Sequence, residues 1–212
     1  LTATDANRFV IRIAREITQR PKILVFNYCY HGSVDETLIA LHGGVAAARA
    51  GNVGPPIDPT RTSKVIEFND VDALRAALAP RDVACVLAEP AMTNIGIVLP
   101  EPGYHDALRA LTRQTETLLI LDETHTLSAG VGGYTRAHNL QPDLLTVGKA
   151  LGGGMAAGAF GATKEVAERM FARKDADYVD VGGIGGTLAG NALSLAAMRA
   201  TLENVLTEEN YA

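Results

Sequence analysis

Apolar runs alternate along this chain of 212 residues with segments whose apolar residues recur at helical spacing. Phe9, Ile13 and Ile17 lie four residues apart with charged side chains between them. This pattern predicts an amphipathic helix over residues 5–19. The apolar run that follows predicts a short buried strand over residues 22–28.

The same alternation continues through the middle of the chain. Four further apolar runs predict strands, and two segments between them carry apolar residues on one helical face. The predicted strands cover residues 64–68, 83–88, 117–121 and 143–147, and the predicted helices cover residues 71–79 and 102–114. Because strands alternate with helices, we expect an α/β fold with a mostly parallel, doubly wound sheet.

The remaining segments give less regular patterns. They predict a short helix at 33–41, a surface excursion at 43–63, a strand at 156–163 whose direction is left open, a helix from Thr163 to Ala172, an acidic loop at 175–180 and a last helix at 188–206.

Composition and charge argue against some classes of protein. Hydrophobic residues make up 47% of the chain, enough for a sizeable core, and the net charge of −5 without a basic patch argues against a nucleic-acid partner. The longest uncharged stretch, residues 150–163, is too short and too rich in glycine to span a bilayer. Cys29 and Cys85 form no disulfide framework and predict reduced thiols in a cytoplasmic protein.

Charged residues follow two of the predicted buried strands. Asp122 ends the run at 118–121, and Lys149 follows the run at 143–147, just before a group of glycines. The carboxyl ends of strands in an open α/β sheet form the crevice where ligands bind. A carboxylate and a lysine at that edge are the pair that pyridoxal phosphate (PLP) requires, for its ring nitrogen and its carbonyl carbon.

Two nucleotide-binding alternatives fit poorly. Residues 118–125 resemble the Walker B strand of an ATPase, but such an enzyme also needs a phosphate-binding loop of the form G-x-x-x-x-G-K-[ST]. At the Gly-Lys pair of this chain, Asp143 stands where the first glycine is required and Ala150 where Ser or Thr is required. The chain also has no G-x-G-x-x-G at the first strand-to-helix turn, as a Rossmann dehydrogenase would.

Five motifs, in order along the chain, carry a resemblance to a known family. They are Tyr30-His31-Gly32, Glu89-Pro90, Asp122-Glu123, the run from Pro142 to Phe160, and Gly186-Thr187-Leu188-Ala189-Gly190-Asn191. With these motifs the chain resembles the class III aminotransferases among the fold-type-I PLP enzymes. Within them it is most similar to the branch that holds glutamate-1-semialdehyde aminomutase and the β-amino-acid (β-phenylalanine-type) transaminases.

The resemblance implies roles for the residues at the crevice. Lys149 is expected to form a Schiff base with PLP, and burial would lower its pKa; the alternative is a surface lysine before a flexible hinge. Asp122 is expected to hold the protonated ring nitrogen. Tyr30 is expected to stack on the ring, and Thr124 stands where the family usually carries Val against it.

A phosphate site is also implied. The phosphate loop of the family aligns with Thr2, Ala3 and Thr4, so the Thr2 side chain and the N–H groups of Ala3 and Thr4 are expected to bind phosphate. Ala3 replaces the usual glycine. The alternative is an ordinary helix cap. Thr187 is expected to precede the last helix and to reach the phosphate of a neighbouring subunit, which implies a homodimer with shared sites.

Four further residues have open roles. Glu89 is expected near the cofactor, where it orients its neighbours, and the alternative is a solvated turn residue. His31 is interpreted as a hydrogen-bonded structural histidine. His125 is either a ligand-facing donor or structural, and Arg136 either meets a substrate carboxylate or lies on the surface.

The function that follows is a PLP-dependent aminotransferase. It would move an amino group between a carboxylated amine, such as a β-amino acid, and a keto acid. The alternatives are a glutamate-1-semialdehyde 2,1-aminomutase, which transfers the amino group within one molecule, and a folded but inactive truncated PLP domain. Residues 1–212 are expected to be the central part of the large cofactor domain, with an N-terminal segment and a C-terminal small domain outside them. No metal is expected.

Overall fold

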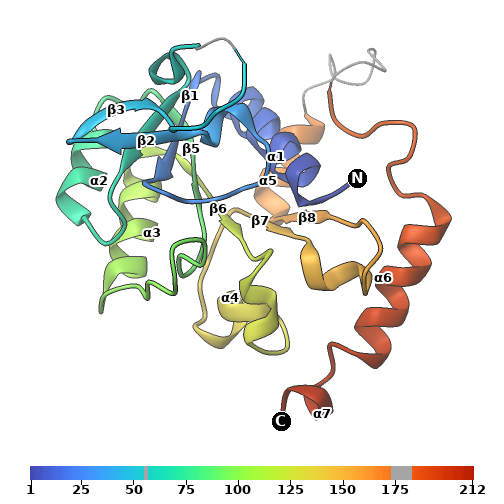
Figure 1. Ribbon diagram of the computed structural model, residues 1–212. Coiled ribbons are helices and arrows are strands. Elements are labelled where there is room, and N and C mark those ends of the chain that lie inside the picture. Colours follow the sequence, from blue (N-terminus) through green and yellow to red (C-terminus); the bar gives the residue numbers. More distant parts are fainter. Residues whose placement is uncertain (55–56, 173–182) are drawn as a thin grey trace.

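The computed structural model describes residues 1–54, 57–172 and 183–212 (Figure 1). Six strands of these residues form one sheet, in the order β4-β1-β5-β6-β7-β8. Five run parallel and β8 pairs antiparallel with β7 at one edge. The strands are β1 (Lys22–Phe26), β4 (Ser63–Ile66), β5 (Val83–Ala88), β6 (Leu118–Asp122), β7 (Leu144–Val147) and β8 (Ala159–Ala162). The predicted mostly parallel α/β fold is confirmed.

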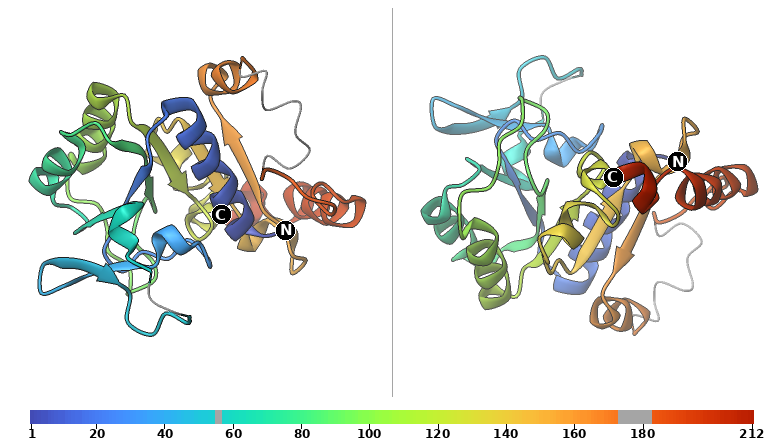
Figure 2. Two further views of the ribbon diagram at one scale, coloured as in Figure 1. Left: turned by 90° about the horizontal axis from the view of Figure 1, so that it is seen from above. Right: turned by 90° about the horizontal axis from the view of Figure 1, so that it is seen from below.

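Helices cover both faces of the sheet (Figure 2). Helix α1 (Ala3–Thr18) crosses one face with α5 (Lys164–Phe171) beside it, and α2 (Val71–Leu78) and α3 (Tyr104–Thr115) pack on the other. The amphipathic pattern that predicted the first helix is confirmed, since its buried residues form one stripe. The arrangement is doubly wound because both faces of the sheet are apolar and each is buried by helices.

The central strands explain the continuous apolar runs. Every residue of β5 and of β6 is buried, as expected for parallel strands that are covered on both faces. The run in β6 ends in the charged Asp122, which is the register neighbour of Thr146 on β7. The carboxyl ends of β6 and β7 therefore lie side by side.

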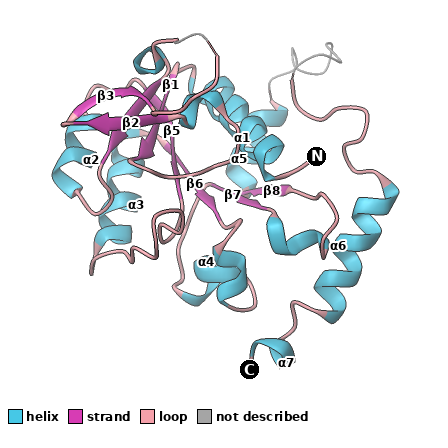
Figure 3. Cartoon of the chain, viewed as in Figure 1, coloured by secondary structure: helices cyan, strands magenta, loops and turns pink. Residues whose placement is uncertain are grey.

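The predicted short helix at 33–41 is wrong. A single turn of 3-10 helix, η1 (Asp35–Thr37), is followed by β2 (Ile39–His42), which pairs with β3 (Val45–Ala48). The segment predicted as a surface excursion at 43–63 does lie at the surface over β3, but it forms a strand there that the sequence does not predict, and the hairpin lies beside the main sheet (Figure 3). Gly43 and Gly44 connect its strands, both with positive φ (59° and 83°), as a tight two-residue hairpin turn requires.

The last predicted helix begins later than expected. Helix α6 spans Ala192–Asn204, because the side chain of Asn191 accepts a hydrogen bond from the Ser194 N–H at 3.0 Å and caps it. Thr187 therefore does not precede the helix directly, and its expected position at a helix N-terminus is wrong.

The predicted loop at 175–180 lies outside the described residues. The other short elements are η2 (Pro59–Arg61), η3 (Thr126–Ala129), α4 (Gly133–Ala137), η4 (Lys149–Gly152) and α7 (Glu208–Tyr211).

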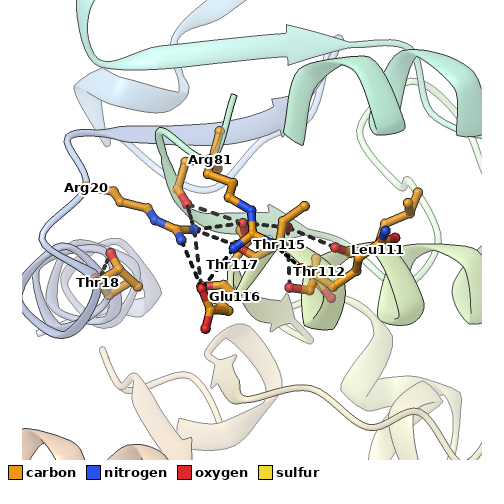
Figure 4. Close-up of polar contacts among 11 residues, drawn as sticks. Thr18, Arg20, Arg81, Leu111, Thr112, Thr115, Glu116 and Thr117 are labelled. Atoms are coloured by element: carbon orange, nitrogen blue, oxygen red, sulfur yellow. Dashed lines mark hydrogen bonds and ion pairs between the residues drawn. The ribbon is translucent and has the colours of Figure 1, made fainter. Parts of the chain in front are cut away.

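Arg20 fixes the amino-terminal edge of the sheet (Figure 4). Its Nη1 donates to the carbonyls of Val83 at 3.2 Å, Thr115 at 2.9 Å and Glu116 at 3.2 Å. The last carbonyls of a helix lack partners within the helix, so this arginine satisfies the end of α3 and joins it to the start of β5.

In the described part of the chain, no helix combines the length and apolarity needed to cross a membrane.

Candidate functional site

A pocket of about 280 Å³ opens at the carboxyl ends of β6 and β7. It brings together residues from four distant segments: the start of α1, the loop after β1, the end of β6 and the loop after β7. Seven of the predicted site residues line it, namely Thr2, Ala3, Thr4, Tyr30, Asp122, Thr124 and Lys149. The predicted crevice is therefore present as a single site.

A larger cleft of about 680 Å³ lies around Arg20 and Arg109, near the opposite edge of the sheet. Two of its arginines are held by the protein itself. Arg20 is held by backbone carbonyls, and Arg109 makes two hydrogen bonds to Asp143, at 2.7 and 3.0 Å. These contacts assign structural roles to Arg20 and Arg109, and the pocket at Asp122 is the candidate site because the predicted residues meet there.

The Asp122 carboxylate is buried and accepts three hydrogen bonds. Its Oδ2 accepts from Asn7 Nδ2 and from His31 Nδ1, both at 2.8 Å, and its Oδ1 accepts from the Thr124 N–H at 3.0 Å. Burial favours the neutral acid, but the hydrogen bond and charge of His31, with the bonds from Thr124 and Asn7, outweigh it and lower the pKa to about 2. Asp122 is therefore ionised, and Oδ1 can accept one more donor.

His31 is the counter-charge to this acid. Its imidazole is completely buried, and Nε2 has no hydrogen-bond partner among the described residues. Burial alone would lower its pKa, but neighbouring Cys29 and the bonded Asp122 reverse that effect and raise the pKa to about 10. The histidine is hydrogen-bonded, as its structural interpretation requires, and its partner is the acid of the site.

Lys149 lies at the rim of the pocket. The expected burial of Lys149 is wrong, because its side chain is exposed. The turn η4 starts at this residue directly after Gly148, with a positive φ of 29°, so the chain leaves the buried sheet before the lysine. In the described segments Lys149 pairs with no carboxylate, which leaves its amine available to a ligand.

Glu89 does not line the pocket, but it holds a loop that does. It is buried, with 3% of its surface exposed. Its carboxylate accepts from the Tyr30 N–H at 3.4 Å, from the Thr93 N–H at 3.0 Å and from Thr93 Oγ1 at 2.6 Å. It thereby fixes the loop that presents Tyr30, a pocket-lining residue that is 46% exposed.

The amino end of α1 closes another side of the pocket. The Thr2 N–H donates to Asp5 Oδ2 at 2.7 Å, so Asp5 caps the first turn. The N–H groups of Ala3 and Thr4 belong to the first turn and have no acceptor within the helix. These amides and the positive end of the helix dipole form a local environment that favours an anion.

Three glycines allow the surrounding loops to approach this first turn. A Cβ at Gly148 would lie 2.6 Å from the Ala3 Cβ, which real Cβ atoms do not tolerate. The same crowding applies to the other two pairs. The pairs are Gly148 with Ala3, Gly158 with Thr2 and Gly32 with Thr4. The methyl of Ala3 is accommodated because residue 148 has none.

Thr124 carries a hydroxyl without a partner. Its Oγ1 is buried and makes no hydrogen bond in the described residues, although the side chain lines the pocket. A buried hydroxyl ordinarily has a partner. The pocket therefore offers one unsatisfied polar group beside the acid.

The other predicted residues lie outside the pocket lining. Thr187, His125 and Arg136 are exposed and do not line it. Asn7 is a lining residue that the sequence pattern missed. The signal was present, because Asn7 interrupts the apolar stripe of α1 formed by Ala6, Val10 and Ile11.

The pair of His31 and Asp122 predicts a particular dependence of stability on pH. A raised pKa in the folded state stabilises the protein fully below the unfolded value of 6.5, and this contribution disappears as the pH rises toward about 10. We therefore expect the free energy of unfolding in urea to fall between pH 7 and pH 10 by on the order of a few kcal/mol more in the native chain than in His31→Gln.

His42→Gln is the matched control, since His42 is exposed. This variant should follow the native chain across the range. A parallel decline of the native chain and His31→Gln would contradict the assignment of a charged His31.

The comparisons with known proteins agree with this geometry. The model of the aminotransferase class-III family matches residues 2–212. The chain is 39% identical over 206 residues to glutamate-1-semialdehyde 2,1-aminomutase of Syntrophomonas wolfei, an alignment that covers 95% of this chain and 46% of the relative. The chain thus spans about half the length of the curated relatives it matches.

Solved structures show the same relationship. A glutamate-1-semialdehyde aminomutase from Pseudomonas aeruginosa PAO1 superimposes with a TM-score of 0.93 at 48% identity, covering 98% of this chain and 47% of that one. A β-phenylalanine aminotransferase from Variovorax paradoxus gives a TM-score of 0.78 at 28% identity, covering 100% and 45%. The resemblance inferred from the motifs is confirmed: the chain belongs to the class III aminotransferase family.

Proposed function

We propose that this chain is the cofactor-binding part of a PLP-dependent enzyme that transfers the amino group of a carboxylated amine. The observation that carries the proposal is one pocket lined by a buried, ionised Asp122, an exposed Lys149 without a carboxylate partner, and the amino end of α1. A related aminomutase structure from Pseudomonas aeruginosa, similar to this chain at 48% identity, is a complex with PMP, and this supports the choice of cofactor.

The residues present fit PLP in their chemistry. The free acceptor capacity of Asp122 suits a protonated ring nitrogen. The first-turn amides of Ala3 and Thr4, with the side chain of Thr2, suit a phosphate. The unpartnered Oγ1 of Thr124 suits a polar group of the ring system. Five of the residues predicted from the sequence therefore suit one ligand.

Each residue then has a defined task. When bound, PLP supplies an electron sink for negative charge at the carbon that bears the amino group. Asp122, as a carboxylate, would accept the hydrogen bond of the ring N–H. Tyr30 provides an aromatic face for the ring. Glu89 holds the loop of Tyr30 in place.

Lys149 performs two tasks at its Nζ. With PLP bound, Nζ would hold the aldehyde carbon of the cofactor through a covalent bond that forms with loss of water. With cofactor and substrate amine bound, Nζ would remove a proton from the substrate carbon as a general base and return it as a general acid. Its exposed place at the pocket rim leaves it free to change partners between these tasks.

The identities among relatives favour one form of amino transfer. Similarity to the aminomutases, at 48% and 39%, exceeds the 28% to the β-phenylalanine aminotransferase. We therefore place the intramolecular aminomutase reaction on glutamate-1-semialdehyde ahead of intermolecular transamination of a β-amino acid with a keto acid. Both reactions use the same residues of this chain.

A homodimer with shared sites completes the proposal. Thr187 is exposed and does not line the pocket of its own chain. A role at the phosphate would therefore require the pocket of a second copy. The class III family relationship supports this assembly.

Covalent attachment tests the assignment of Lys149. Addition of PLP to the chain should produce a visible absorbance band, and borohydride should fix the cofactor onto Lys149, as located by peptide mapping. Lys149→Ala should lose the band and the label. Lys164→Ala is the matched control, since Lys164 is 89% exposed and outside the pocket. Label on another lysine, or an unchanged band in Lys149→Ala, would exclude the assignment.

The two forms of transfer differ in their need for an acceptor. We expect product from glutamate-1-semialdehyde alone, with no keto acid added, at a rate at least about tenfold above that of β-amino-acid transamination. The rates can be compared by chromatography of the products. Turnover that depends strictly on an added keto acid would favour the transaminase instead.

The shared site makes a separate prediction. Sedimentation should show a dimer at micromolar concentration, and Thr187→Ala should bind PLP about tenfold more weakly because one charge-assisted phosphate contact is lost. Ser128→Ala, at an exposed residue outside the pocket, is the control. A monomer that binds PLP equally well with and without Thr187 would refute the shared site.

A further inference from the structure

We infer that Asn7 is a positioning residue, which orients the Asp122 carboxylate toward the ring nitrogen of the cofactor. The inference rests on the proposed function and extends it to a residue that belongs to none of the motifs of the chain. Asn7 lies in the second turn of α1 and lines the pocket.

Three hydrogen bonds hold the Asn7 amide in a fully buried position, and both of its N–H donors are used. Nδ2 donates to Asp122 Oδ2 at 2.8 Å and to the His31 carbonyl at 3.1 Å. Oδ1 accepts from Thr146 Oγ1 at 2.7 Å. Asn7 and Thr146 both have an exposed fraction of 0%. No water therefore competes for these bonds, and each partner loses a bond if the amide is removed.

The amide can adopt only one orientation. Both groups that face Nδ2 are acceptors, the carboxylate of Asp122 and the carbonyl of His31. A flipped amide would place Oδ1 against these two oxygens and would leave its donors unpaired. The Thr146 hydroxyl, as the donor on the other side, reinforces the same choice. The direction of the hydrogen bond to Asp122 is therefore fixed by its surroundings.

This amide also joins the three elements that carry the proposed cofactor contacts. Asn7 is on α1, whose first turn faces the phosphate in the proposed site. Asp122 ends β6, and Thr146 is on β7, three residues before Lys149. Without Asn7, Oδ2 of Asp122 would keep only the bond from His31. The carboxylate could then rotate away from the direction that leaves Oδ1 open to the ring.

A purely structural asparagine elsewhere in the chain provides the comparison. Asn27 is also buried, at 5% exposure, and its Nδ2 donates to a carboxylate, Glu67 Oε1, at 2.7 Å. Its Oδ1 accepts from the Leu41 N–H at 2.9 Å. Asn27 does not line the pocket. Asn27→Ala thus removes a similar set of bonds without touching the acid of the site.

Two ligands separate positioning from general stability. Pyridoxamine phosphate has an amine in place of the aldehyde and binds without condensing with Lys149. An analogue with carbon in place of the ring nitrogen has the same shape but no ring N–H. Titration calorimetry of the native chain should give at least about tenfold tighter binding of the nitrogen ligand, the effect of one charge-assisted hydrogen bond. This preference tests the proposed function.

The variants then test the inference. Asn7→Ala should lose most of the preference for the nitrogen ligand, while its affinity for the carbon analogue stays within about twofold of the native value. Asn27→Ala should keep the native preference. Thr146→Val keeps the shape of the residue in β7 and removes only the hydroxyl that fixes the amide, so it should lose part of the preference even if Asn7→Ala folds poorly.

The possible outcomes are distinguishable. Equal weakening of both ligands in Asn7→Ala and Thr146→Val would assign Asn7 a structural role only and overturn the inference. An unchanged preference in both variants would also overturn it. A native chain that binds neither ligand, or binds both equally, would refute the proposed role of Asp122 itself, and the inference would fail with it.

Discussion

The buried charge of Asp122 is the constraint on which the rest of the site depends. A carboxylate at the end of a covered parallel strand costs several kcal/mol unless donors replace the lost water. The sheet cannot supply them, because the backbone of a parallel strand is already paired with its neighbours. The donors come instead from Asn7 on α1, from His31 after β1 and from the Thr124 backbone beyond β6. Two segments remote in sequence must therefore meet at this carboxylate.

This requirement also positions the rest of the pocket. If the second turn of α1 bonds to Asp122, then its first turn must lie just beyond the acid, at the mouth of the pocket. The loop that delivers His31 likewise begins with the exposed Tyr30, whose N–H is held by Glu89. The phosphate end and the aromatic face of the proposed site are thus consequences of compensating one charge.

The sequence predicts best those parts whose signal is local. The strand at 83–88 was predicted with its observed bounds, because an apolar run is the whole requirement of a strand covered on both faces. The hairpin strand β3 was missed, since Val45-Ala46-Ala47-Ala48 has little of the β-branched or aromatic character that marks strands. The start of α6 at Ala192, later than the predicted residue 188, depended on the capping hydrogen bond at Asn191.

The site residues also differ in whether a local sequence signal predicts them. Asp122 and the first turn of α1 could be located from strand ends and a helix start, which are local features. Asn7 could not be located in this way, because its role depends on a hydrogen bond to Asp122, which lies 115 residues away in the sequence. The exposure of Lys149 could not be predicted either, since it depends on where the chain leaves the sheet.

Close contact between α1 and the lysine-bearing turn depends on the sizes of two residues rather than on one. A glycine at residue 3 would give the backbone room on its own. Here the Ala3 methyl occupies space that Gly148 leaves open, and a second methyl at residue 148 would come within 2.6 Å of it. Interiors are packed too densely to absorb such an overlap without moving backbone. The first-turn amides can therefore remain beside Lys149 only while residue 3 or residue 148 is glycine. Because residue 3 is alanine in this chain, residue 148 has to be the glycine.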